Sequence, residues 1–277
     1  MPAPESKPVD RRVPPFQFND MAVLDPDLLL HAYAIGVFPM AESRDSPKII
    51  WIEPRRRAIL PLDGFHLSRS LRRTLRSGVF EVTRDRAFAE VVHHCADRDE
   101  TWINGPIEKS YNLLHMLGHA HSIECWQDGE LVGGLYGVRQ GAAFFGESMF
   151  SLRPDASKVA LAWLVARLKF GGFQLLDCQF MTEHLRSLGA VEISQKDYMA
   201  LLSSALVCVA PEGAVVAAGG SGTLTTGAAS LPGLAVGAGD DVLPDFEALD
   251  RLLEDPARTE AGPASGWVIA QLLGQAS

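Results

Sequence analysis

The fold is decided by the stretch AFFGESMFS (143–151), LRPDASKVALAWLVARLKFGG (152–172), FQLLDCQF (173–180) and MTEHLRSLGA (181–190). It predicts an apolar strand, then a helix, then a second apolar strand, an order typical of neighbouring strands joined by a crossover helix. Glu147, Asp177 and Gln179 would then lie on interior strands, where polar groups are costly to bury unless they are paired or used. We therefore expect both the central sheet and the functional site in this stretch.

The composition is that of a globular protein with one large domain or two small ones. The chain has 277 residues, of which 47% are hydrophobic and 21% are charged. No apolar run is long enough to span a bilayer, and the Pro-rich, charged start does not resemble a signal peptide. The cysteines show no metal-ligand spacing, so we expect reduced thiols, no metal and a cytoplasmic location without a membrane partner; they are Cys95, Cys125, Cys178 and Cys208.

The net charge of −9 belongs almost entirely to the end of the chain. From Asp197 onward there are ten acids and two bases, whereas residues 1–196 hold 24 acids and 23 bases. The acidity of the whole chain therefore does not argue against an anionic partner for the body of the protein.

Changes in composition divide the chain into three parts. Residues 1–62 predict a small N-terminal domain that begins with a flexible arm and contains a helix capped by Asp25. Residues 63–205 predict the main domain, which contains the stretch quoted above. Residues 206–277 are acidic, and half of the residues from Pro211 to Asp240 are Gly or Ala, which favours disorder. Short helices at 245–255 and 266–273 are the alternative for the last part of this tail.

Glycine positions predict how the strands of the body are connected. Asp128-Gly129 separates two alternating apolar runs, which is a strong signal for a two-residue hairpin, and Gln140-Gly141 marks a second, weaker turn. Gly133-Gly134 lies inside a strand and indicates a bulge or a close approach of another segment.

A basic helix face is predicted over residues 68–78. The spacing of its arginines places all of them on one side, opposite Leu71 and Leu75; they are Arg69, Arg72, Arg73 and Arg76. Such a face is often only a solvated surface. No acid interrupts it, however, which favours contact with nucleic-acid phosphates.

Several motifs, in this order along the chain, resemble the leucyl/phenylalanyl-tRNA–protein transferase family. They are FNDMAVLDPDLLLHAYAIGVFPM, HLSRSLR, TWI, AHSIECW, LVGGLYGV, FFGESMFS, DASKVAL, LLDCQ and HLRSLGA, and they span about residues 16–203. The resemblance implies a mixed α/β fold in which a domain like that of the GNAT acetyltransferases, with a central mixed sheet, follows a smaller domain. It also implies transfer of Leu or Phe, and less well Met, from aminoacyl-tRNA to proteins with an N-terminal Arg or Lys, which marks them for N-end rule degradation. No cofactor is expected, and the protein is expected to be a monomer.

The resemblance implies catalytic roles for Asp177 and Gln179. Both residues lie on one strand, two positions apart, so their side chains would share a face. An amide is a very weak base, so we expect Gln179 to accept a hydrogen bond from the attacking amine while Asp177 orients that amide. The alternative is that Asp177 buttresses a loop and Gln179 satisfies a strand end.

The remaining implied residues bind the two substrates. Glu147, in GESMFS, would pair with the acceptor's N-terminal side chain or ammonium, unless it forms an internal ion pair with a residue such as Lys158. Trp102 would stack on the terminal adenine of the tRNA, unless it is partial core. Trp51 stands where the family has a pair of tryptophans, and only one is present here.

The donor side chain needs an apolar pocket. The resemblance places Leu164 and Leu168 near it, although both also fit an ordinary core. Gly146 leaves room for close approach of a ligand or a backbone segment.

Two other classes of function compete with this reading. A coenzyme A-dependent acyltransferase would need a glycine-rich turn at the helix start, where this chain reads SLRPDASK. A tRNA-binding protein without catalysis would need only the basic face and Trp102. The histidines show no convincing metal or triad pattern.

Overall fold

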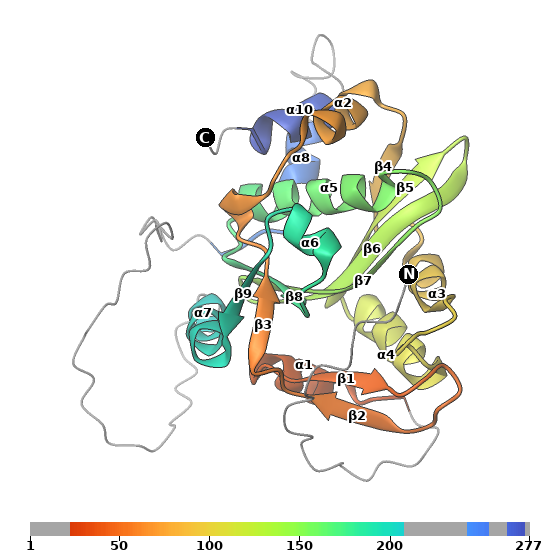
Figure 1. The fold of residues 1–277 in the computed structure, drawn as a ribbon, viewed down its shortest axis with the longest axis vertical. Coiled ribbons are helices and arrows are strands. Elements are labelled where there is room, and N and C mark those ends of the chain that lie inside the picture. The colour runs from red at the N-terminus through yellow and green to blue at the C-terminus, as the bar shows by residue number, and fades with distance from the viewer. Residues whose placement is uncertain (1–22, 208–242, 255–264, 275–277) are drawn as a thin grey trace, which may run out of the picture.

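A seven-stranded mixed sheet forms the centre of the molecule (Figure 1). The structure is a computed structural model that describes residues 23–207, 243–254 and 265–274. The strand order is β4-β5-β6-β7-β8-β3-β9, and β7 and β8 are parallel whereas the other neighbours are antiparallel. The strands are β3 (Arg56–Ile59), β4 (Glu81–Arg84), β5 (Ala120–Gln127), β6 (Glu130–Gln140), β7 (Ala143–Ser151), β8 (Leu175–Gln179) and β9 (Val191–Ser194).

The expected crossover is confirmed. Helix α5 (Ala156–Phe170) joins the parallel strands β7 and β8 and is buried along most of its length. It lies very close to the sheet, because a Cβ added at Gly133 would stand 2.5 Å from the Cβ of Ala156. The glycine inside β6 therefore permits the close approach that the sequence predicts.

Both expected hairpins are present. Gln127 pairs with Glu130 across the first turn, where Asp128 and Gly129 have φ values of 54° and 81°. Two positive φ values at the central positions match the right-handed twist of the flanking strands, which is why Asp-Gly suits this turn. The second turn joins β6 and β7 as expected.

The first helix and the basic helix begin at the capping residues that the sequence predicts. Asp25 caps the first helix by accepting a hydrogen bond from the Leu28 amide at 3.0 Å, and Ser68 caps the basic helix through the Leu71 amide at 3.2 Å. Besides α5, the helices before the tail are α1 (Pro26–Ala34), α2 (Arg69–Ser77), α3 (Phe88–Ala96), α4 (Gly105–Met116), α6 (Glu183–Ser187) and α7 (Gln195–Val207), with a 3-10 turn at Leu62–Gly64.

Two apolar layers cover the sheet, one on each face. The first layer contains buried residues of α1, α3, α4 and α7, and the second contains those of α2 and α5. Figure 1 shows α5 and α2 on one side of the sheet and α3 and α4 on the other. The mixed α/β fold with a large mixed sheet is confirmed.

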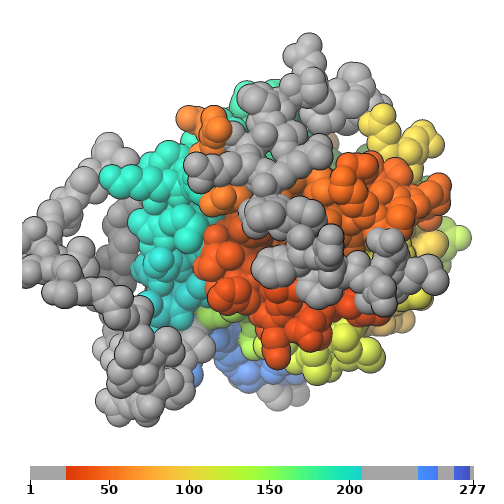
Figure 2. Space-filling model, turned by 90° about the horizontal axis from the view of Figure 1, so that it is seen from below, coloured from red at the N-terminus to blue at the C-terminus, as the bar shows by residue number. Residues whose placement is uncertain are grey.

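The N-terminal module is less separate than the expected division at residue 62 implies. It contains α1 and a two-stranded sheet of β1 (Phe38–Ala41) and β2 (Ile49–Ile52). Strand β3, however, lies inside the main sheet between β8 and β9, because its apolar residues are needed there to complete the core. Residues of α1, β1 and β2 share one apolar cluster with α3, α4 and α7, and Figure 2 shows the module beside α7.

The end of the tail also differs from the expected disorder. Helices α8 (Ala248–Glu254) and α10 (Ser265–Leu272) pack on α5 and α2. Phe246 is fully buried and its ring stacks on Phe144 with a centroid distance of 5.5 Å. Burial of this ring and of Leu249 offsets the cost of ordering the segment. The arm at 1–15 and the Gly/Ala-rich part of the tail lie outside the described residues.

Three of the cysteines are free thiols in the described part of the chain: Cys95, Cys125 and Cys178. Among the helices that the structure describes, none has the length and apolar character needed to cross a bilayer.

Candidate active site

Glu147 lies at the centre of a buried polar cluster. It projects from β7 and is 8% exposed. Its Oε1 accepts hydrogen bonds from the Tyr33 hydroxyl at 2.7 Å and from Gln179 Nε2 at 2.8 Å, and its Oε2 accepts one from the Tyr111 hydroxyl at 2.8 Å. Helices α1 and α4 and strand β8 therefore each supply one partner to this acid.

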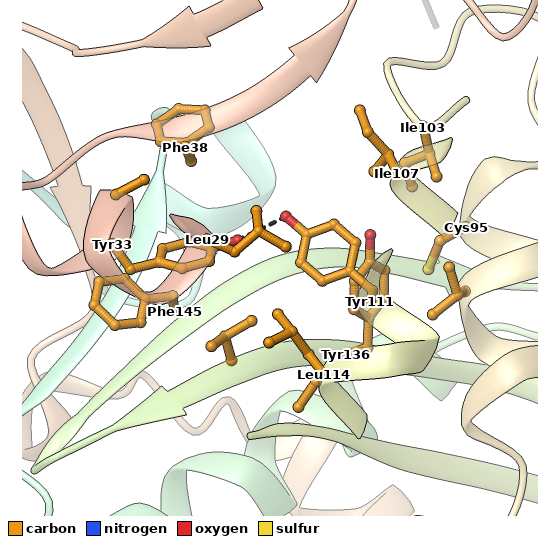
Figure 3. Close-up of a cluster of buried hydrophobic side chains, with 14 of the residues drawn as sticks. Leu29, Tyr33, Phe38, Cys95, Ile103, Ile107, Tyr111, Leu114, Tyr136 and Phe145 are labelled. Carbon is orange, nitrogen blue, oxygen red and sulfur yellow. Dashed lines mark hydrogen bonds between the residues drawn. The ribbon is translucent and has the colours of Figure 1, made fainter. Parts of the chain in front are cut away.

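The two tyrosines also contact each other. Their hydroxyl oxygens lie 2.6 Å apart, and Figure 3 shows the rings from α1 and α4 pointing toward one another. Tyr33, Tyr111 and Glu147 thus form a ring of three oxygen–oxygen contacts, which needs three protons. The hydroxyls supply two when Glu147 is ionised and accepts from both tyrosines, so all three contacts are hydrogen bonds only when Glu147 carries the third proton and donates it to one tyrosine.

The environment explains why Glu147 can hold a proton near neutral pH. Burial raises the pKa of its carboxyl from 4.5 to about 7, against hydrogen bonds from Tyr33, Tyr111 and Gln179 that favour the charged form. The negative charge of Asp177 is a smaller contribution to the same rise. Glu147 is therefore poised to change its charge when a cation arrives beside it.

Gln179 ends β8 in an unusual backbone conformation. Its φ is +60°, in the left-handed region that non-glycine residues seldom occupy. Asp177 Oδ1 accepts a hydrogen bond from the Gln179 backbone amide at 2.8 Å. The expectation that Asp177 orients the Gln179 side-chain amide therefore needs correction: Asp177 holds the backbone, and Glu147 holds the amide, because the turn at the strand end separates the two side chains.

Asp177 is fully buried and paired. The Arg57 guanidinium contacts it in a fork, with Nη2 at 2.5 Å from Oδ2 and Nε at 2.9 Å from Oδ1. The Tyr198 hydroxyl adds a hydrogen bond to Oδ2 at 2.9 Å. The Asp177 carboxylate is thus fixed in position next to the Gln179 backbone.

A cavity of about 240 Å³ opens in front of Glu147 and Gln179. Trp102, Gly146 and Leu164 line it, as the sequence predicts for the donor side. Other lining residues come from β7, α5, β8 and the segment after it, and they include Leu161, Leu176, Phe180 and His184. The largely apolar wall and the polar floor are typical of a small-molecule site.

Two of the expected donor-site residues lie elsewhere. Trp51 is 5% exposed and packs in the apolar cluster around the N-terminal module. Leu168 is fully buried in the other cluster, one turn beyond Leu164 on α5. Both belong to the core; on α5, the turn that faces the cavity is that of Leu161 and Leu164 and not that of Leu168.

The basic face has the expected geometry. Leu71 and Leu75 are buried against the core, and Arg69 and Arg73 are exposed on α2. Helix α10 packs beside this face, and the Arg76 guanidinium lies 5.1 Å from the centre of the Trp267 ring. Part of the face therefore contacts the C-terminal segment, which the sequence did not predict.

The alternative ion pair of Glu147 is wrong. Lys158 Nζ bonds Asp155 at 2.8 Å, whereas Glu147 has the tyrosines and Gln179 as partners. Within the described ranges, no three His, Cys, Asp or Glu side chains cluster closely enough to hold a metal ion.

The sequence did not reveal four residues around the cluster: Tyr33, Arg57, Tyr111 and Tyr198. Arg57 is one of three consecutive arginines and is 1% exposed, while Arg56 beside it is exposed. The alternation of a strand is the one signal that separates them, and it requires knowing that this short segment is an interior strand.

An apolar cavity with a buried acid and an amide at its floor, on a mixed sheet with a crossover helix, fits an α/β enzyme that transfers an apolar acyl group to an amine. A family model described as leucyl/phenylalanyl-tRNA protein transferase matches residues 59–203, and the model of that family's N-terminal domain matches residues 22–55. The chain belongs to the leucyl/phenylalanyl-tRNA–protein transferase family, and it is an aminoacyltransferase.

Curated relatives carry the same description. A leucyl/phenylalanyl-tRNA–protein transferase from Rhizorhabdus wittichii is 59% identical over 262 residues, which cover 93% of this chain and all of the relative. One from Zymomonas mobilis is 60% identical over 188 residues, covering 66% of this chain and 70% of the relative. A solved GCN5-related N-acetyltransferase-like protein from Streptococcus suis 89/1591 has a TM-score of 0.28 at 16% identity, covering 60% of this chain and 65% of that chain; this likeness is too low to argue from.

Proposed function

We propose that this protein transfers Leu or Phe, and less well Met, from aminoacyl-tRNA to the α-amine of proteins that begin with Arg or Lys. The product would be marked for N-end rule degradation. The protein would act in the cytoplasm as a monomer without a membrane partner. No cofactor is needed, because the aminoacyl ester of the tRNA is already reactive.

The cavity supports the donor half of this proposal. Trp102 offers an aromatic face for the terminal adenine, and stacking of a base on such a face is worth about 1–3 kcal/mol. Leu161 and Leu164 give the apolar wall for the donor side chain. An apolar wall separates side chains of similar size by only about 1–3 kcal/mol, which fits a preference shared among Leu, Phe and Met.

Glu147 and Gln179 support the acceptor half. A cation beside Glu147 would lower the pKa of its carboxyl and release its proton, so the acid would become a charged partner for the acceptor's ammonium or its Arg or Lys side chain. Gln179 Nε2 donates to Glu147, so its carbonyl Oε1 would be the atom that accepts a hydrogen bond from the attacking amine.

The reaction needs positioning more than it needs strong chemistry. The amine nitrogen forms a bond to the ester carbonyl carbon, the bond to the ribose oxygen breaks, and a proton lost by the amine ends on that oxygen. Holding the two substrates in register lowers the barrier by removing much of the entropy cost. The observation that carries the proposal is the 2.8 Å contact between Gln179 Nε2 and Glu147 Oε1 at the floor of an apolar cavity.

The test uses the full-length protein with radiolabelled Leu-tRNA and a peptide beginning with Arg. We expect the label to move from the tRNA to the peptide. A peptide of the same sequence with an acetylated N-terminus is the control and should stay unlabelled. Absence of label on the free peptide would contradict the proposal.

A parallel reaction with labelled acetyl-CoA tests the rival donor. The start of α5 carries Asp155, whose carboxylate bonds Lys158, at the place where such enzymes bind pyrophosphate. A carboxylate there opposes phosphate binding, so we expect no acetylation of the peptide.

A further inference from the structure

We propose that Arg57 and Tyr198 are positioning residues for the transfer reaction: together they fix Asp177, and through Asp177 they fix the backbone of Gln179 and the direction of its side-chain amide. This inference rests on the proposed role of Gln179 at the acceptor amine. Neither residue contacts the cavity that receives the substrates.

The contacts leave Asp177 little freedom to move. Its Oδ2 accepts hydrogen bonds from Arg57 Nη2 at 2.5 Å and from the Tyr198 hydroxyl at 2.9 Å. Its Oδ1 accepts hydrogen bonds from Arg57 Nε at 2.9 Å and from the Gln179 backbone amide at 2.8 Å. A guanidinium fork of this kind fixes both the position and the plane of the carboxylate. The Gln179 amide is thus the one donor on this carboxylate that belongs to the cavity wall.

The guanidinium itself is held from three sides. Arg57 Nη1 donates to the Gly36 carbonyl at 2.9 Å. The guanidinium carbon lies 4.7 Å from the centre of the Phe38 ring and 4.6 Å from that of the Tyr198 ring. Arginine suits this place because its planar group both forks onto a carboxylate and stacks on aromatic faces, which lysine does not do.

The charge of the pair matters as much as its geometry. Asp177 is fully buried, and an uncompensated carboxylate there would be strongly unfavourable. Arg57 supplies the compensating positive charge, and the negative charge of Asp177 contributes to the raised pKa of Glu147. Arg57 and Asp177 therefore set the electrostatic environment of Glu147, the acid that Gln179 contacts.

Gln179 needs such support because of its backbone. A φ of +60° costs free energy for a residue with a side chain, and such strain persists only where the surroundings impose it. The hydrogen bond from its amide to Asp177 supplies this constraint. A loosened Asp177 would let the strand end relax and would turn the Gln179 side chain away from Glu147.

The experiment compares Tyr198→Phe, Arg57→Lys and Arg57→Gln with the wild-type full-length protein. Tyr198→Phe removes one hydrogen bond to Asp177 and keeps the ring that packs on Arg57. The matched control is Arg167→Lys. Arg167 lies on α5 and is another buried arginine that pairs with an aspartate, in this case Asp250. For each protein we would measure kcat and KM for Leu-tRNA and for the Arg peptide, together with the thermal midpoint.

We expect kcat to fall about tenfold in Tyr198→Phe and about a hundredfold in Arg57→Lys, with KM for both substrates within about twofold of wild type. The kcat of Arg57→Gln should be lower than that of Arg57→Lys, because glutamine also removes the positive charge. Arg167→Lys should lower the thermal midpoint and leave kcat unchanged. The proposal is overturned if Tyr198→Phe and Arg57→Lys keep wild-type kcat, or if KM rises in step with the loss of stability.

A second readout does not depend on turnover. The NMR signals of the Gln179 backbone and side-chain amides should shift in Tyr198→Phe and stay in place in Arg167→Lys. Unshifted signals in Tyr198→Phe would overturn the positioning role of Tyr198. This outcome counts even if the wild-type protein fails to transfer label and the proposed function itself is wrong.

Discussion

At the scale of single residues, the chemistry of the site depends on how Glu147 is surrounded. Its partners come from segments as far apart in the chain as Tyr33 and Gln179, and burial is the largest influence on its pKa. The hydrogen bonds it accepts act in the opposite direction, because they stabilise the charged form. The balance between these effects can be tested by changing one hydroxyl.

Tyr111→Phe should raise the pKa of Glu147 above about 7, because it removes a hydroxyl that donates to Oε2. If Glu147 must be charged to bind the acceptor, the acid limb of kcat/KM for the Arg peptide should move to higher pH by about one unit. Tyr136→Phe is the control, since Tyr136 is equally buried and its hydroxyl has no hydrogen-bond partner within the described residues. An acid limb that moves equally in both variants would contradict the prediction.

Glu147→Gln should remove a pH-dependent loss of stability. The folded carboxyl has a pKa of about 7, above its ordinary 4.5, so between these values the folded state binds more protons than the unfolded state. The wild-type free energy of unfolding should therefore fall as pH rises through this window, by about 3 kcal/mol in total.

The variant should lack this fall while losing transfer activity. Urea unfolding from pH 5 to 8 should show the stability difference growing in favour of Glu147→Gln as pH rises. Glu254→Gln, at an exposed position of α8, should show a difference that does not change with pH. A constant difference for Glu147→Gln would show that this carboxyl does not have a raised pKa.

At the scale of elements, short segments from distant parts of the chain complete the fold. Strand β3 lies between β8 and β9, Phe246 stacks on Phe144 of β7, and Asp250 of α8 pairs with Arg167 of α5. Asp250 accepts hydrogen bonds from Arg84 Nε at 2.9 Å and from Arg167 Nη1 at 2.8 Å. One carboxylate therefore links the C-terminal segment to both the sheet and the crossover helix.

Asp250→Asn should lower the free energy of unfolding by about 3 kcal/mol, because it leaves the buried Arg167 guanidinium without its charged partner. Chemical denaturation would measure the loss. Glu254→Gln, four residues away on the same helix, should stay within about 0.5 kcal/mol of wild type. Equal stabilities of the two variants would show that α8 does not depend on this pair.

At the scale of the whole molecule, the basic helix α2 and the net negative charge lie in different parts of the chain. The exposed arginines of α2 remain the proposed contact for tRNA phosphates, although the tail carries most of the net negative charge. Contacts of this kind release counterions from the nucleic acid, so their strength falls as salt rises.

Arg73→Ala should weaken binding of Leu-tRNA and Phe-tRNA by the same factor and should reduce the slope of log affinity against log salt by about 1. Lys109→Ala is the control, since Lys109 is an exposed base on α4, on the other side of the sheet. Binding titrations between 50 and 200 mM salt (roughly the range over which such contacts weaken strongly) would decide. An unchanged slope for Arg73→Ala would exclude a phosphate contact at this residue.

The sequence by itself determined the features that depend on local order. Asp25 and Ser68 cap their helices because a side-chain oxygen reaches an amide three residues on, and Asp128-Gly129 turns because both residues accept positive φ. The resemblance of the motifs around Glu147, Asp177 and Gln179 to the family pointed to this part of the chain, and the catalytic roles of these residues stay predictions.

Only the tertiary structure decided which side chains meet across the fold. Trp51 and Leu168 are core residues. Of the three consecutive arginines, Arg57 is the buried one, and it pairs with Asp177. Tyr33, Tyr111 and Tyr198 reach the site from helices far apart in the chain. Such contacts depend on packing distances between distant segments, and neither the spacing nor the composition of any one segment contains those distances.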